Sequence, residues 1–97
     1  MPKPKRPSKP IAPFTIGKAY FIRGVTMYQT GRLVGLTPTE LILEDAAWIA
    51  DTGRFADAVK SGQFSEVEPF PAKRVVIGRG QIVDAFEWDA PLPMVQR

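Results

Sequence analysis

The chain has 97 residues, of which 44% are hydrophobic, and a formal net charge of +3 at pH 7. This length and composition predict one small domain with a single core. The sequence has no cysteine and no histidine, which excludes disulfides, zinc sites of the usual kind and catalysis by a thiol or an imidazole. We therefore expect no catalytic residue, no metal and no cofactor.

The first thirteen residues predict a basic, proline-rich arm. Its first ten residues carry a charge of +4 without an acid, which leaves −1 for residues 11–97. Five prolines oppose helix and sheet, so the arm is expected to be extended or disordered. It is either a solubilising tail or an electrostatic contact for nucleic acid or another acidic surface. The cations are Lys3, Lys5, Arg6 and Lys9.

Runs of β-branched and aromatic residues predict strands within a domain at 14–90. The first expected strand lies within residues 19–28, with Gly24 at a bulge or bend, and a turn is expected somewhere within residues 24–30. A second covers residues 31–36, and a third covers 40–44 and ends at 45–49. Residues 37–39 form the turn between them, with a proline at its second position.

Residues 47–73 predict an insertion with a short helix at 52–61. Asp51 or Thr52 is the expected N-cap, and Gly62 suits the position after the last turn. Phe55 and Val59 share one helix face and are expected to pack on the barrel. Residues 63–73 should cross back as an extended linker, and residues 91–97 form a C-terminal tail.

Residues 74–88 contain two more strand-like runs, at 74–77 and 82–88, around Gly78-Arg-Gly-Gln81. Two glycines in four residues predict a tight hairpin with positive φ angles and with Arg79 at its tip. The run at 82–88 has no proline and few charges, so we expect the edge strand Ile82–Trp88 to pair with another subunit in a homo-oligomer.

Five short strands with glycine bends predict a mainly β fold, a small and strongly bent antiparallel barrel with a short helix between strands 3 and 4. Gly31-Arg-Leu-Val-Gly35 followed by Leu41-Ile-Leu-Glu-Asp-Ala46 resembles the first motif of the Sm-like (LSm) family. Ile77-Gly-Arg-Gly-Gln-Ile-Val83 resembles its second motif. The resemblance implies a five-stranded Sm-like/SH3-like barrel that forms rings and binds single-stranded RNA.

The resemblance also implies candidate ligand contacts. Arg79 matches the arginine of the second motif, and Gln81 follows in the same turn. The first-motif turn is one residue shorter than in the family, reads Thr37-Pro-Thr-Glu40, and lacks the family's Asp and Asn. Ionised Glu40 repels phosphate and only accepts hydrogen bonds, so this turn and the insertion indicate a ligand other than uridine-rich RNA.

The whole chain also resembles a family of small phage-encoded proteins that share the block at 44–55, Glu-Asp-Ala-Ala-Trp-Ile-Ala-Asp-Thr-Gly-Arg-Phe. This second resemblance implies no chemistry. Because no apolar run is long enough for a transmembrane helix and no apolar h-region follows the basic N-terminus, we expect a soluble, intracellular protein, and with this resemblance a location in the cytoplasm of a bacterial host cell. Trp48 and Phe55 are either core residues or, with Asp51 and Arg54, a surface that stacks a base and binds phosphate.

Three acids of this region, Glu44, Asp45 and Asp51, are candidates for acid–base or metal chemistry. Neighbours on a strand face opposite sides, so we expect these carboxylates to be solvated or paired with arginine.

The sequence therefore predicts a non-enzymatic, oligomeric module that recognises single-stranded nucleic acid or a nucleotide and does not bind membranes. One alternative is an anti-defence protein that sequesters a host cyclic or ADP-ribose-type nucleotide signal. The other is a structural phage protein that uses the barrel for assembly or binds a host protein.

Overall fold

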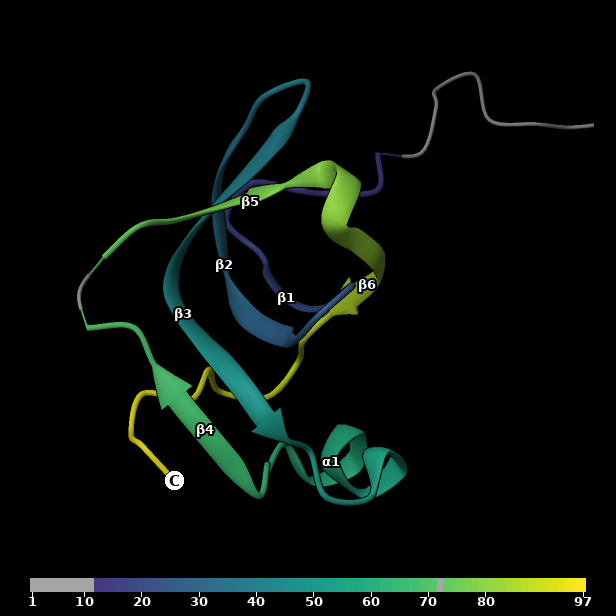
Figure 1. Cartoon of the computed structure of the whole chain (residues 1–97), viewed down its shortest axis with the longest axis vertical. Coiled ribbons are helices and arrows are strands. Elements are labelled where there is room, and N and C mark those ends of the chain that lie inside the picture. Colours follow the sequence, from purple (N-terminus) through teal and green to yellow (C-terminus); the bar gives the residue numbers. More distant parts are fainter. Residues whose placement is uncertain (1–11, 72) are drawn as a thin grey trace, which may run out of the picture.

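The computed structural model describes residues 12–71 and 73–97, so the four cations of the predicted arm lie outside the described residues (Figure 1). The fold is mainly β, as predicted: six strands form one antiparallel sheet, and one short helix follows the third strand. The elements are β1 (Ala19–Gly24), β2 (Tyr28–Leu36), β3 (Glu40–Asp51), α1 (Phe55–Ser61), β4 (Glu66–Pro69), β5 (Val75–Gly78), the 3-10 turn η1 (Arg79–Gln81) and β6 (Ile82–Glu87).

The long strand β3 carries a different neighbour on each half of one edge. Residues 40–43 pair with β5, and residues 47–51 pair with β4. β2 pairs with the other edge of β3, and the order continues through β1 to β6. Figure 1 shows β2 and β3 strongly curved, with η1 leading from β5 to β6 at the end of the sheet away from β4 and α1.

The bend of β3 follows from a bulge in which Asp45 and Ala46 stand opposite the single residue Gly31 of β2. Asp45 has a φ of 51°, in the left-handed region that aspartate tolerates better than most residues. A Cβ on Gly31 would lie 2.9 Å from Cδ1 of Leu43 and 3.3 Å from Cβ of Ala46. Glycine at this position therefore lets the two strands approach where the sheet bends.

The prediction of a hairpin at 74–88 is wrong. Both strands form, but β5 pairs with β3, whereas β6 pairs with β1. The link between them is the 3-10 turn η1, and Gly78 has a φ of −69° instead of a positive value. The ends of η1 bond elsewhere: the N–H of Arg79 donates to the carbonyl of Thr39, and the carbonyl of Gln81 accepts from Val25, each over 2.9 Å. Contacts with two other turns thus replace the hairpin.

The expected five strands are six, because the predicted linker at 63–73 contains the additional strand β4. Its Val67 lies opposite Ile49 of β3 and is buried. Two further expectations are confirmed: the register of β1 against β6 shifts at Gly24, and residues 37–39 form the turn between β2 and β3.

The helix α1 begins at Phe55, three residues later than predicted. The N–H of Gly53 donates to Oδ1 of Asp51 over 2.8 Å, so this aspartate closes a turn ahead of the helix instead of capping it. Gly62 ends the helix with a φ of 74°, as expected. The side chain buried by the helix is Ala58, whereas Val59 is 44% exposed, against the prediction that it packs on the barrel.

Hydrophobic clusters cover both faces of the sheet. Neighbouring residues on β1 alternate between the two, which is why Tyr20, Phe21 and Ile22 are all buried. The first cluster contains Tyr20, Ile22, Leu33, Leu41, Leu43, Ala46 and Ile77. The second contains Phe21, Ala47, Ile49, Ala58, Phe64, Val67 and Trp88.

The C-terminal tail lies along β4. Arg97 exchanges two backbone hydrogen bonds of 3.0 Å with Val67, and Nε2 of Gln96 donates to Glu68 over 2.9 Å. Leu92 packs against the second cluster. Across residues 12–71 and 73–97, none of the helical segments has the length and apolar composition that crossing a membrane requires.

Candidate functional site

The structure brings the two sequence motifs together at one corner of the sheet. In the turn between β2 and β3, the N–H of Thr37 donates to the carbonyl of Glu40 over 3.0 Å, and the N–H of Thr39 donates to Oγ1 of Thr37 over 3.2 Å. The N–H of Arg79 donates to the carbonyl of Thr39. We call Thr37, Thr39, Glu40 and Arg79 the Arg79 corner.

The Arg79 side chain is half-buried and differs in its partners from four other described cations. Its Nε is buried without a hydrogen-bond partner among the described residues, which also offer it no ion pair. By contrast, Lys18, Arg23, Arg32 and Arg74 each pair with a carboxylate. A buried donor without a partner costs about 1–3 kcal/mol, so an acceptor bound at this corner gains that interaction.

The predicted contact Gln81 lies apart from the Arg79 corner. Its backbone carbonyl faces Val25 in the turn between β1 and β2, and its side chain lies beside Gly24. Arg79 and Gln81, which the second motif placed together, therefore contact two different turns from the two ends of η1.

The second predicted surface does not form as a single pocket. Trp48 meets Phe70 edge to face, with ring centroids 5.0 Å apart, and Phe70 packs on the first cluster. Phe55 instead packs on Phe21 of the second cluster, with centroids 5.9 Å apart. The two aromatic rings thus belong to opposite faces of the sheet. Arg54 is exposed at the helix start.

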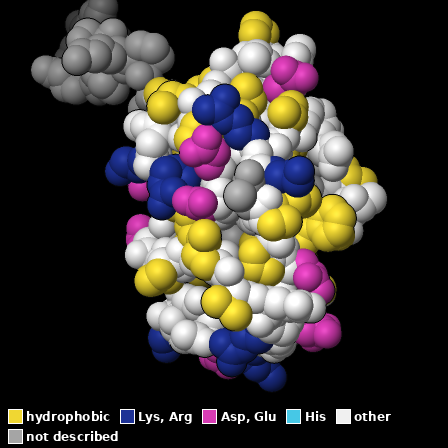
Figure 2. Space-filling view, turned by 90° about the vertical axis from the view of Figure 1, so that its left-hand side faces the viewer, with side chains coloured by type: hydrophobic (Ala, Val, Ile, Leu, Met, Phe, Trp, Pro, Cys, Tyr) yellow, Lys and Arg dark blue, Asp and Glu magenta, His cyan; other side chains and the backbone are white. Residues whose placement is uncertain are grey.

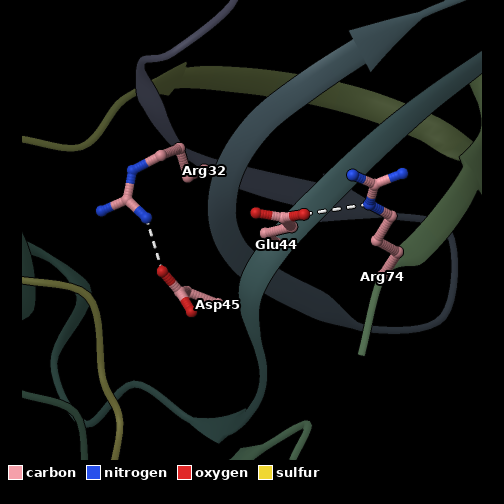
Figure 3. A network of polar contacts seen from close by, with 4 residues as sticks. All are labelled: Arg32, Glu44, Asp45 and Arg74. Atoms are coloured by element: carbon pink, nitrogen blue, oxygen red, sulfur yellow. Dashed lines mark hydrogen bonds and ion pairs between the residues drawn. The ribbon is translucent and has the colours of Figure 1, made fainter. Parts of the chain in front are cut away.

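The neighbouring acids Glu44 and Asp45 pair with separate arginines, as predicted. Nε of Arg74 donates to Glu44 over 2.9 Å, and Nη1 of Arg32 donates to Asp45. Figure 3 shows the two carboxylates turned towards different partners. No group of three acids in the described part of the chain is placed to hold a metal ion.

A further site, which the sequence did not reveal, is a cleft of about 580 Å³ at the end of β1. Arg23 lies opposite both Tyr28 of β2 and Asp84 of β6, so these three side chains are neighbours on one face. We call this site the aromatic cleft, and it is lined by Arg23, Tyr28, Thr52, Phe55, Asp84, Ala85 and Phe86.

Arg23 and Asp84 form a two-point ion pair in the aromatic cleft. Nε of Arg23 donates to Oδ1 of Asp84 over 2.9 Å, and Nη2 donates to Oδ2. The hydrogen bond from Arg23 holds the pKa of Asp84 below its ordinary value of 3.8. The same hydrogen bond and the charge of Asp84 raise the pKa of Arg23, which stays protonated at any physiological pH.

The aromatic side chains of the cleft rest on the buried ring of Phe21. Phe86 stacks on Phe21 with centroids 5.2 Å apart and an interplanar angle of 23°. Phe55 meets Phe86 edge to face at 6.2 Å and 88°, and is 46% exposed. The cleft therefore offers aromatic surfaces to a planar ligand beside a fixed guanidinium.

The surface of the sheet carries no continuous basic track on the face shown in Figure 2. Lys and Arg side chains there lie next to Asp and Glu side chains, and hydrophobic side chains gather between them. This mixed surface agrees with the charge of −1 for residues 11–97. The face drawn in Figure 2 therefore offers separate cations instead of a continuous basic surface to a polyanion.

Comparisons with known proteins add no assignment to these sites. No known protein family, curated protein or solved structure matches the chain. Conclusions about function therefore depend on the geometry of the Arg79 corner and of the aromatic cleft.

Proposed function

We propose that the protein is a non-enzymatic binding module for single-stranded nucleic acid or a nucleotide, built on an Sm-like small barrel and acting as an oligomer in the cytoplasm of a bacterial host cell. The observation that carries this proposal is Arg79, with its buried and unpaired Nε beside the turn at 37–40. The sheet order, in which η1 links β5 on one side to β6 on the other, supports the barrel.

The chemistry of the Arg79 corner fits a nucleotide. A guanidinium stacks on a base and donates to a phosphate or carbonyl from the same planar group. The carboxylate of Glu40, which accepts a hydrogen bond from the hydroxyl of Thr37 over 3.4 Å, supplies acceptors that a base with N–H groups uses and a phosphate does not. The corner therefore favours a ligand that presents both donors and acceptors.

The exposed edge of β6 supports assembly. β6 pairs with β1 on one side, and no described strand covers its other side. Val83 on β6 is 61% exposed, and Val76 on β5 is 57% exposed. An edge of this kind pairs readily with a strand of another subunit. Rings formed in this way would bring several copies of Arg79 together.

The test is binding of short single-stranded RNA and DNA and of small nucleotides to the native protein and to Arg79→Ala. We expect the variant to bind about 10-fold or more weakly, the scale of a lost charge-assisted hydrogen bond. Arg74→Ala is the matched control, because Arg74 is exposed and already paired with Glu44. Equal binding by the native protein and Arg79→Ala would exclude the Arg79 corner as the site.

The salt dependence of the affinity distinguishes a single-stranded nucleic acid from a small nucleotide as the ligand. A strand that contacts several cations gives a steep decrease of affinity with salt, whereas a small nucleotide gives a shallow one. The aromatic cleft, with its volume of about 580 Å³, favours the second candidate, a module that sequesters a small signalling nucleotide. Absence of binding to both ligand classes would leave the structural phage protein as the remaining reading.

A further inference from the structure

We propose that the aromatic cleft binds a guanine-type base through the O6 and N7 acceptors of its Hoogsteen edge. Arg23 reads these two acceptors, and Asp84 is a positioning residue that holds the guanidinium in place. The site shares no residue with the Arg79 corner, so it is tested separately from binding there, and it rests on the second candidate function above, the binding of a small nucleotide.

The size and lining of the cleft match a nucleoside. Its volume of about 580 Å³ lies within the range of about 300–1,000 Å³ that is typical of small-molecule sites. Phe55 and Phe86 stand almost perpendicular, so a base that lies on one ring meets the edge of the other. Stacking on such rings stabilises a bound base whatever its identity, because every base has a planar aromatic face.

The two hydrogen bonds to Asp84 leave three N–H groups of Arg23 without a carboxylate partner, on a guanidinium that also lies near Tyr28. Asp84 takes the N–H of Nε and one N–H of Nη2, which are two of the five donors of a guanidinium. The N–H groups that point away from this carboxylate, on Nη1 and Nη2, form a second fork. Because Asp84 fixes the plane of the group, the second fork is oriented before a ligand arrives.

The ion pair of Arg23 with Asp84 favours a base that presents neutral hydrogen-bond acceptors over a charged phosphate. Asp84 compensates the charge of Arg23 and repels a phosphate that approaches the same guanidinium. Guanine presents two neighbouring neutral acceptors, O6 and N7, which match an arginine fork. Adenine offers N7 beside an amino donor and so mismatches it. Cytosine also has two neighbouring acceptors, but its single ring covers less of the aromatic walls.

The test is titration of the full chain with nucleosides, with binding measured by calorimetry or by the fluorescence of Trp88. The ring centroids of Trp88 and Phe86 are 6.2 Å apart. Guanosine and inosine should bind within about 2-fold of one another, because both keep O6 and N7. Adenosine and 7-deazaguanosine, which lack one of the two acceptors, should bind about 10-fold or more weakly. Cytidine should rank below guanosine. Equal binding of guanosine and 7-deazaguanosine, or no nucleoside binding, would overturn the assignment.

Variants locate the effect. Arg23→Lys keeps the charge but lacks the fork, and should remove most of the preference for guanosine over 7-deazaguanosine. Phe55→Ala should weaken all nucleosides alike, since it removes stacking without changing the fork. Asp84→Asn should also lower the preference for guanosine over 7-deazaguanosine. If Asp84 only stabilised the fold, its replacement would leave that preference unchanged. Arg23→Lys with an unchanged preference would contradict the assignment.

Arg32→Lys is the matched control. Arg32 has a similar exposure to Arg23 and pairs with Asp45, outside the cleft. The Arg32→Lys variant should bind guanosine with the same affinity as the native protein. Loss of oligonucleotide binding in Arg79→Ala and loss of the preference for guanosine over 7-deazaguanosine in Arg23→Lys report on the two sites separately. Melting temperatures of all variants show whether each one folds.

Discussion

Arg23 and Asp84 are 61 residues apart in the chain, yet they stand directly opposite one another on β1 and β6 and share two hydrogen bonds. Tyr28 lies opposite Arg23 on its other side. The three strands of this corner thus meet in a single row of interacting side chains. This arrangement joins the first and last strands of the sheet and forms the polar end of the aromatic cleft.

The first prediction concerns stability against pH. Because the folded-state pKa of Asp84 is below its ordinary value of 3.8, its pair with Arg23 stabilises the fold above about pH 4 and stops doing so as the pH falls through the folded-state pKa. The melting temperature of the native protein should exceed that of Asp84→Asn at pH 7, and the gap should close as the pH falls below 3.8 and through the folded-state pKa of Asp84. The gap should also narrow in about 1 M salt, because the pair is exposed. A gap that persists unchanged at low pH would contradict this account.

The second prediction concerns the bulge of β3. Gly31→Ala places a Cβ 2.9 Å from Leu43 and should lower the free energy of unfolding by about 1–3 kcal/mol, the usual cost of overpacking. Gly80→Ala is the control, since an added Cβ there meets nothing within 4 Å. Urea denaturation of both variants measures the difference, and equal stability of the two would show that the strands separate easily at the bend.

The third prediction separates two roles of Arg79. One alternative is that Arg79 pairs with Asp84 or Glu87 of a neighbouring subunit. Within one chain, however, these carboxylates already pair with Arg23 and Lys18. We therefore expect Arg79→Ala to keep the oligomer while its affinity falls, and Arg79→Lys to restore little because lysine lacks the planar fork. Light scattering and affinity are measured on the same preparation. Dissociation with intact ligand binding would support the interface role instead.

The fourth prediction concerns the basic arm. Deletion of residues 1–10 removes four cations, and if these contact a nucleic acid, the slope of log affinity against log salt should flatten by roughly 3. The melting temperature should stay unchanged, since the sheet and both hydrophobic clusters lie outside the deleted segment. An unaltered slope would identify the arm as a solubilising tail.

The fifth prediction concerns assembly through β6. The native protein should sediment as an oligomer, and Val83→Lys should shift it towards the monomer, because a charge on an edge strand opposes pairing. Val59→Lys is the control: Val59 is also exposed but lies on the helix α1 and not on an edge strand. A monomeric native protein at tens of micromolar would rule out the assembly.

Local sequence patterns predicted the positions of most strands, but they did not predict their partners. The runs at β5 and β6 read as a hairpin because strand propensity and glycine turns are local properties, whereas the observed pairings depend on contacts with two other turns. β4 was missed for a different reason. It contains one buried residue, Val67, between two glutamates, and it ends in a proline, so its pattern resembles a linker.

The two candidate sites differ in how far the sequence alone could predict them. The Arg79 corner was predictable, because the resemblance marked both of its parts. The aromatic cleft was not, since Arg23, Phe55 and Asp84 come from three separate segments and meet only after β1 pairs with β6. Phe55 alone belonged to the predicted surface, and its expected neighbour Trp48 lies on the other face of the sheet.

The pairing of β1 with β6 has a consequence for synthesis of the protein. β1 is complete at residue 24, but its partner strand does not emerge from the ribosome until more than sixty further residues have been added. The segment from β2 to β4 pairs with near neighbours and can fold while the chain is still growing. The nascent chain therefore keeps one edge of β1, with Tyr20, Phe21 and Ile22, unpaired until β6 has been synthesised, so the aromatic cleft forms later than the contacts among β2, β3 and β4.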